Sequence, residues 1–204
     1  MDTTKPSIQH SFLVAIAFVA TLWCIKVLEL WLGLSLHEWG VYPNALSGLK
    51  GILSAPLIHG SWQHLLGNTL PLLILGSMLI YGYPRSRWCT LGLVWIISGL
   101  GVWLFGRESY HFGASGLTHG MFFYLLFIGI FRRDKRSIAL LMIAFFMYGS
   151  MVMTIFPREP GISFEYHLFG GLGGVVCAIL FRHWDPKPAV KTYDWEDEDD
   201  PTDD

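Results

Sequence analysis

Residues 62–82 read WQHLLGNTLPLLILGSMLIYG and contain no Asp, Glu, Lys or Arg. A run of this length matches the roughly 20 apolar residues that a helix needs to cross the ~30 Å hydrocarbon core of a bilayer. Tyr83 and Pro84 follow it and end the helix, because proline cannot continue the hydrogen-bond ladder. The stretch therefore predicts a membrane-spanning helix, although it carries two strongly polar side chains, His64 and Asn68.

Apolar runs of the same kind lie on both sides of this stretch, separated by short polar segments. The further predicted spans cover residues 11–33, 88–105, 115–131, 137–156 and 167–181. The whole chain has 204 residues, of which 52% are hydrophobic and 15% charged, whereas a soluble domain carries about 25% charged residues. The sequence predicts an all-α polytopic membrane protein with six transmembrane helices.

The segments outside the spans divide the chain into three parts. Residues 1–10 are expected to form a cytoplasmic N-terminal segment, residues 11–183 the membrane core, and residues 184–204 an acidic cytoplasmic tail. Half of the 16 acidic residues lie from Asp194 onward, a composition typical of disorder. Residues 34–61 form a long first loop, in which the semi-apolar segment 46–57 is too short to cross and predicts an interfacial element.

Lysines and arginines indicate the orientation of the spans. With the N-terminus in the cytoplasm, ten of them fall in cytoplasmic segments and three on the opposite side, so the positive-inside rule predicts that both termini are cytoplasmic. We expect the protein to lie in the plasma (inner) membrane. The first run resembles a signal peptide in its small residues Ala17 and Ala20, but it stays apolar through Leu34 without a good cleavage site.

Several functions find no support in the composition. Cys24, Cys89 and Cys177 lie in or beside apolar runs without CxxC spacing, so neither a disulfide framework nor a zinc site is expected. The basic residues occupy short loops rather than one patch, so no nucleic acid partner is expected. The bilayer itself is the expected environment.

Polar side chains at membrane depth are costly and need a reason. Three predicted helices carry them: His64 and Asn68 in the second span, Ser115 and His119 in the fourth, and His167 at the start of the sixth. With the predicted topology, all three positions lie near the outer ends of their helices. Because these groups share one depth, we expect them to form a common site.

Each group has a chemical use and an ordinary structural alternative. His64 and Asn68 are four residues apart, so both can direct N–H donors from one helical face. Ser115 lies between Gly113 and Gly116 at a helix start, where open amides favour developing negative charge; a serine there can act as a nucleophile. A lone serine is more often a helix cap, and a lone interfacial histidine more often structural. The occurrence of all these polar residues at one depth favours a functional site over separate structural roles.

The sixth span continues after His167 with Gly170 and Gly174. Glycines four residues apart leave a smooth helical face on which another helix can pack closely. This packing would bring His167 against the helix of Ser115.

Three motifs resemble the rhomboid family of intramembrane serine proteases. They are HGSWQHLLGN at residues 59–68, GASG at 113–116 and HLFGGLGG at 167–174. They occur in the family's order and on the family's helices, and the resemblance covers residues 10–183. It implies a six-helix rhomboid-like bundle with an interfacial first loop.

The resemblance also implies the roles of individual residues. Ser115 would be the nucleophile and His167 its general base, with no acidic third member and no cofactor. His64 and Asn68 would hold the oxyanion together with the Ser115 amide. His59 would be a structural histidine. The substrates would be single-span or polytopic membrane proteins, cut within or near the bilayer, and the loop 157–166 would be a mobile cover.

Two positions depart from the family pattern. The first loop has Glu38 and Trp39 where relatives often have an adjacent Trp-Arg pair, which bears on the stability of that loop. His119 stands where many relatives have a tyrosine that packs against the base. It can pack as a flat ring or compete as the base, since it faces Ser115 at i,i+4; His167 is favoured because it comes from a separate helix.

Two other classes of function compete with proteolysis. The chain can be a non-catalytic rhomboid-like protein that binds membrane clients, although it keeps both the serine and the histidine. It can also be a metal or proton transporter that uses its histidines, but no carboxylate is expected at their depth. The absence of an HExxH motif disfavours a zinc metalloprotease.

Overall fold

A computed structural model of the chain describes residues 6–157 and 161–188, and in these ranges the regular elements are all helical. Six helices are long and apolar enough to cross a membrane. They are α1 (Ile8–Trp31), α3 (Trp62–Gly82), α4 (Arg87–Phe105), α5 (Ser115–Arg132), α6 (Lys135–Tyr148) with its 3-10 continuation η4 (Gly149–Ile155), and α7 (Phe164–Phe181). The predicted all-α fold with six spans is confirmed.

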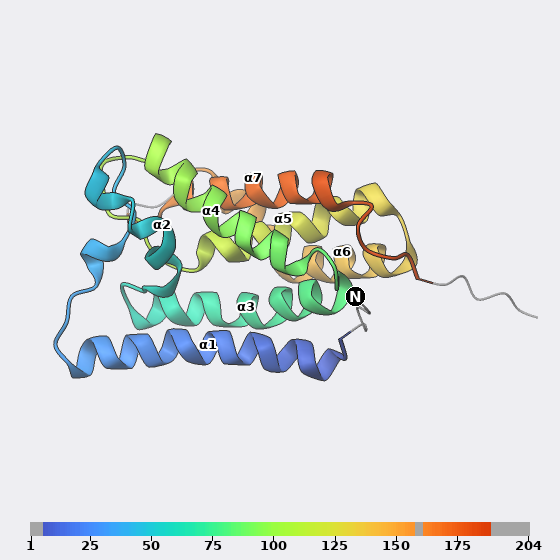
Figure 1. Cartoon of the computed structure of the whole chain (residues 1–204), viewed down its shortest axis with the longest axis horizontal. Helices are drawn as coiled ribbons and strands as arrows, with labels where there is room; N and C mark the ends of the chain where they lie inside the picture. Colours follow the sequence, from blue (N-terminus) through green and yellow to red (C-terminus); the bar gives the residue numbers. More distant parts are fainter. Residues whose placement is uncertain (1–5, 158–160, 189–204) are drawn as a thin grey trace, which may run out of the picture.

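The long helices run along the same axis of the molecule (Figure 1). Helix α1 begins at the end of the bundle where α7 finishes, as an even number of spans requires. The opposite end of the bundle carries the short helices of the first loop (Figure 1). These are η1 (His37–Trp39), η2 (Leu46–Gly48), α2 (Gly51–Ser54) and η3 (Ala55–Leu57). None of them is long enough to cross a bilayer.

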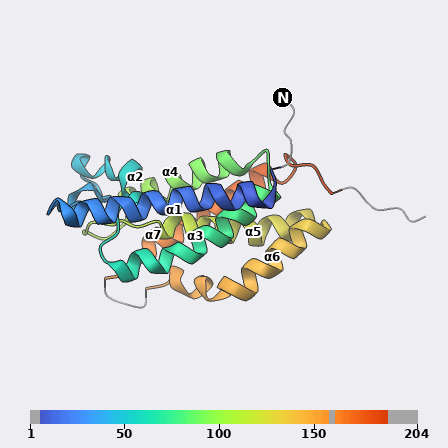
Figure 2. The ribbon, with the colours of Figure 1, turned by 90° about the horizontal axis from the view of Figure 1, so that it is seen from below.

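Helix α5 is the most buried span, because α3, α4, α6 and α7 all pack against it. Its closest neighbour is α7. A Cβ atom on Gly170 would lie 2.2 Å from the carbonyl oxygen of Gly116, and one on Gly174 would lie 2.2 Å from that of Gly120. Only glycine permits this approach. Helix α6 lies at the edge of the bundle (Figure 2).

The first loop is fastened to its surroundings by hydrogen bonds. Val41 and His111 exchange backbone hydrogen bonds of 2.8 and 2.9 Å, which join the first loop to the loop before α5. Trp95 in α4 donates its indole N–H to the Ile52 carbonyl at 3.0 Å. Trp39 has the Lys50 ammonium 4.9 Å from its ring. Trp39 has no adjacent arginine in the sequence, and the cation beside its ring is instead Lys50, from further along the loop.

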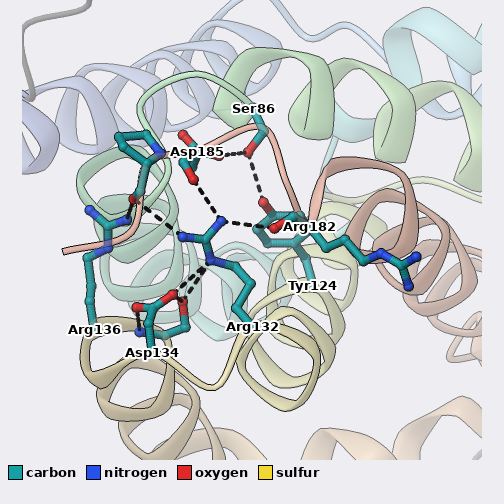
Figure 3. A network of polar contacts seen from close by, with 9 residues as sticks. Ser86, Tyr124, Arg132, Asp134, Arg136, Arg182 and Asp185 are labelled. Atoms are coloured by element: carbon teal, nitrogen blue, oxygen red, sulfur yellow. Dashed lines mark hydrogen bonds and ion pairs between the residues drawn. The ribbon is translucent and has the colours of Figure 1, made fainter. Parts of the chain in front are cut away.

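A buried arginine closes the other end of the bundle. Arg132 donates to the carbonyls of Arg182 and Asp185 at 2.9 and 2.8 Å and to the Asp134 carboxylate at 2.9 Å. The Asp185 carboxylate accepts from Ser86 at 2.6 Å. Figure 3 shows Arg132 between Asp134 and Asp185. This set of contacts, the Arg132 network, joins the turn after α3 and the turn after α5 to the segment after α7.

The helix boundaries differ from the predicted spans at several ends. Helix α7 begins at Phe164 rather than at residue 167, so His167 lies in its first turn. The predicted fifth span changes from α-helix to 3-10 helix at Gly149. Predictions about residues 1–5, 158–160 and 189–204, including most of the acidic tail, lie outside the described residues.

Candidate active site

A cavity of about 590 Å³ opens at the end of the bundle away from the Arg132 network. It lies between α3, α5 and α7, with η4 and the loops before α5 and α7 completing its wall. Its lining includes the five polar residues that the sequence predicted to share one depth: Ser115, His167, His64, Asn68 and His119. Side chains from three separate helices therefore face one hollow.

Ser115 begins α5 and is buried. Gly113, two residues earlier, has a φ of +122°, and a Cβ atom there would lie 2.4 Å from Cε1 of His64. Glycine is therefore needed both for the backbone conformation and for the position of the His64 ring. The Ser115 amide belongs to the first turn of the helix, whose N–H groups have no partner within the helix.

His167 donates one ring hydrogen to the protein backbone. Its Nδ1 lies 3.0 Å from the carbonyl oxygen of Thr154 in η4. A carbonyl oxygen only accepts, so Nδ1 carries the proton and the neutral ring has its lone pair on Nε2. Among the described residues, no hydrogen bond engages this Nε2. His167 thus presents a basic nitrogen at the cavity wall.

His119 has both ring nitrogens occupied. Its Nδ1 donates to the Ser115 carbonyl at 2.7 Å, and its Nε2 lies 2.7 Å from Oγ1 of Thr154. The ring stacks on that of His167, with centroids 4.0 Å apart and planes inclined by 9°. His119 therefore has no nitrogen free for the Ser115 hydroxyl, and its geometry is that of a flat packing ring.

His64 and Asn68 lie in the first two turns of α3. The Ser61 side chain caps this helix by accepting from the His64 amide at 3.1 Å. Asn68 Nδ2 donates one hydrogen to the His64 carbonyl at 3.1 Å, which leaves its second N–H available. Both side chains line the cavity.

His59 lies behind the cavity wall rather than in its lining. It is 2% exposed, and its Nε2 accepts a hydrogen bond from the Ala114 amide at 3.3 Å. Its ring meets that of His64 edge-on at 5.0 Å. Burial, and then the neighbouring His64, lower the pKa of His59 from 6.5 to about 3. A neutral His59 thus anchors the residue before Ser115.

A second group of polar residues ties the two loops beside the cavity together. His111 Nε2 donates to the Arg107 carbonyl at 3.0 Å, so Nδ1 accepts from the Ser163 hydroxyl at 2.6 Å. Arg107 pairs with the buried Glu165 at 3.3 Å. Burial lowers the pKa of His111, which favours this neutral form. The loop before α7 is thereby fixed to the loop before α5.

The sequence did not predict Thr154, His111 or Ser163 as parts of the site. Thr154 contributes to His167 its backbone carbonyl, a group that every residue has, so the sequence gives no signal for that contact. Its side-chain hydroxyl contacts His119. Ser163 was recognisable as a possible helix cap, since serine is favoured at the N-cap and Glu165 places an acidic side chain in the first turn. It does cap α7, accepting from the Tyr166 amide at 3.2 Å.

Metal ligands do not cluster in this part of the molecule. Within residues 6–157 and 161–188, His, Cys, Asp and Glu form no group of three that could hold a metal ion. The three cysteines are free; Cys24 and Cys89 are exposed and Cys177 is buried.

One family model and several relatives match this chain. A family model described as the Rhomboid domain matches residues 47–184. An uncharacterized protein of Mycobacterium tuberculosis is 37% identical over 175 residues, which cover 81% of this chain and 72% of that protein. An uncharacterized Mycobacterium leprae protein is 35% identical over 81% of this chain and 69% of its own. A putative rhomboid protein of Acanthamoeba polyphaga mimivirus is 26% identical, covering 68% of this chain and 78% of that protein.

Proposed function

The chain belongs to the rhomboid family, and from this premise we propose that it is an intramembrane serine endopeptidase with a Ser115–His167 dyad. It cuts single-span or polytopic membrane proteins within or near the bilayer. The observation that carries the proposal is the shared cavity: Ser115 and His167 line it from different helices, and Nε2 of His167 is free to act as a base.

In the proposed reaction, Nε2 of His167 takes the proton of the Ser115 hydroxyl as its oxygen attacks the scissile carbonyl. The Thr154 carbonyl holds Nδ1–H and steadies the imidazolium, the part that a carboxylate has in a triad. The Ser115 amide, His64 and Asn68 stabilise the negative charge on the oxygen of the tetrahedral intermediate by donating hydrogen bonds to it. His167 then gives its proton to the leaving amine, and water resolves the acyl-enzyme.

The substrate must reach the cavity with its backbone unpaired. Open backbone in hydrocarbon is costly, so substrates with small, helix-breaking residues near the cut are expected to be preferred. The opening of the cavity is proposed to face the extracytoplasmic side. The charge distribution supports this orientation, because the end with the Arg132 network holds most of the described lysines and arginines, namely Arg85, Arg87, Arg132, Arg133, Lys135, Arg136, Arg182 and Lys187.

A fluorophosphonate probe tests the nucleophile. The purified protein is expected to be labelled and to cleave a panel of single-span substrates, and the Ser115→Ala variant to do neither. Ser77→Ala is the matched control, since Ser77 donates to the carbonyl of Leu73 within its own helix, outside the cavity. A Ser115→Ala variant that still cleaves would refute the mechanism, and mass mapping of the products would identify the bond cut.

One observation favours a second candidate, a rhomboid-like protein that binds membrane clients without cutting them. Among the described residues, Ser115 Oγ has no hydrogen-bond partner, His167 included. Catalytic hydrogen bonds are often long without substrate, so this does not exclude the enzyme. The client-binding function predicts no probe labelling and equal capture of clients by the wild type and by Ser115→Ala.

A further inference from the structure

A second cavity lies on the flank of the bundle, apart from the candidate active site. It has a volume of about 370 Å³, within the usual range of ligand sites. Helices α1 and α4 form its sides, and α3 and α5 form its floor. Its lining is apolar except for the tryptophan indoles: Val14, Ala15, Phe18, Leu72, Gly76, Ile80, Trp88, Leu91, Gly92, Trp95, Leu117 and Met121. We name it the flank groove.

The flank groove is open beside Trp88 and Gly92. At the end nearer the first loop, Phe18 meets Trp95 edge-on, with ring centroids 6.3 Å apart. Trp88, in the first turn of α4, lies at the end where the chain termini are, and it is 53% exposed. Gly92 leaves space between them, because a Cβ atom there would meet nothing within 4 Å.

A cationic side chain lies at the open end. Arg87 donates from Nη1 to the carbonyl of Ile80 at 3.2 Å, and its guanidinium carbon is 5.5 Å from the Trp88 ring centroid. Ile80 and Trp88 both line the flank groove. Among the described residues Arg87 has no acidic partner within ion-pair distance, and its Nε is buried without a hydrogen bond. A charge without an acidic partner therefore lies beside Trp88 at the open end of the groove.

We propose that the flank groove binds an anionic phospholipid, with one acyl chain in the groove and the phosphate on Arg87. A long apolar cleft between membrane helices suits a hydrocarbon chain, and the guanidinium suits a phosphate, which it can bind through two parallel N–H donors. Basic pockets between spans at the positively charged side of a membrane protein are sites of this chemistry. The lipid would come from the leaflet on the side of the chain ends. This binding does not depend on proteolysis.

Native mass spectrometry of the protein, reconstituted with phosphatidylglycerol and phosphatidylcholine of identical acyl chains, tests the site. The wild type is expected to retain phosphatidylglycerol about tenfold more than phosphatidylcholine. Both lipids carry a phosphate, but the choline cation of phosphatidylcholine offsets the attraction of that phosphate to Arg87. Arg87→Gln is expected to abolish the preference. Gly92→Leu fills open space rather than a packed contact, and is expected to remove retention of either lipid. The control Leu93→Trp adds bulk to the same helix outside the groove and is expected to bind as the wild type does.

Several outcomes would overturn the proposal. Equal retention of the two lipids by the wild type would show that the groove holds any chain, neutral lipid or detergent included. Unchanged lipid binding in Gly92→Leu would show that the lipid binds elsewhere. A dimer mass in the wild type that disappears in Gly92→Leu would show that the groove is occupied by a second copy of the chain. Thermal unfolding of each variant in detergent checks that the bundle is intact.

Discussion

His119 and His167 are stacked rings of one residue type, and their hydrogen bonds distinguish their uses. Both nitrogens of His119 are engaged, by the Ser115 carbonyl and the Thr154 hydroxyl. His167 uses one nitrogen on the Thr154 carbonyl and keeps the other. Thr154 thus contacts both rings and fixes how they lie relative to Ser115.

These contacts separate the two histidines in a mutational test. His119→Phe keeps a flat ring against His167 and loses two hydrogen bonds, so we expect cleavage to fall by about tenfold, as for about 1–2 kcal/mol of lost hydrogen bonding. His167→Ala removes the base and is expected to lower the rate by about 10²–10⁴. Initial rates on one single-span substrate give both values. If His119→Phe abolishes cleavage and His167→Ala spares it, the base is assigned wrongly.

His59 makes stability depend on pH. Its pKa is lowered from 6.5 to about 3 by burial and by His64, so the unfolded chain binds a proton that the folded chain does not. The titration of this histidine therefore leaves the free energy of unfolding unchanged above pH 6.5. As the pH falls from 6.5 toward 3, the free energy of unfolding decreases by up to about 1.4 kcal/mol per pH unit, because protonation of His59 favours the unfolded chain. Thermal unfolding in detergent is expected to show this decline.

The variant His59→Gln removes that titration. It is expected to be less stable than the wild type at pH 8, because the Ala114 amide loses its imidazole acceptor, but to show a shallower decline in stability below pH 6.5. Parallel pH slopes for the two proteins would mean that the titrating group lies elsewhere.

At the scale of helices, the close contact of α5 and α7 depends on two glycines. A Gly170→Ala substitution would force a methyl group onto the Gly116 carbonyl, so we expect a loss of about 1–3 kcal/mol, as for overpacked cores. The matched control is Gly92→Ala, where nothing lies within 4 Å, and where alanine is expected to stabilise the helix by about 0.5–1 kcal/mol. Unfolding in detergent measures both. Equal effects would show that α5 and α7 can move apart without cost.

The elements show which parts of the structure the sequence could predict. Length and apolar composition identified all six spans, and α3 has the predicted bounds, because a bilayer imposes one requirement on every crossing helix. The start of α7 was missed by three residues, since the cap Ser163 precedes the apolar run. The 3-10 segment after Gly149 was missed because its sequence is as apolar as the helix before it.

The candidate site was predictable where its parts are side chains on spans. Ser115, His64, Asn68 and His167 stand out because polar groups are costly in hydrocarbon. The Thr154 carbonyl has no such signal, and His111 lies in a loop where a polar residue is ordinary. Sequence reasoning therefore predicted the polar side chains that line the cavity, and missed the groups that hydrogen-bond to them or fix the loops beside them.

At the scale of the whole molecule, the candidate active site and the Arg132 network lie at opposite ends of one membrane-embedded bundle. The candidate active site occupies one end, and the Arg132 network holds the turns and the segment after α7 at the other. Arg132 is 6% exposed and supplies donors to Asp134 and to carbonyls of Arg182, Asp185 and Pro186. A distance of several helical turns separates it from the cavity, so damage to the network should affect folding rather than chemistry.

This separation predicts the effects of replacing two adjacent arginines. Arg132→Gln would remove the charged partner of the Asp134 carboxylate, which keeps only its hydrogen bonds from Ser137, and the guanidinium that donates to the Arg182 and Asp185 carbonyls. We therefore expect a loss of about 3–5 kcal/mol, as when one partner of a buried pair is removed. Arg133→Gln is the control: Arg133 is exposed and, among the described residues, its side chain donates only to the Ile130 carbonyl. The expected change is within about 0.5 kcal/mol. Below its lowered unfolding temperature, Arg132→Gln should still cleave at the wild-type rate per folded molecule, as counted by fluorophosphonate labelling. A lower rate per labelled molecule would mean that the two ends of the bundle are coupled.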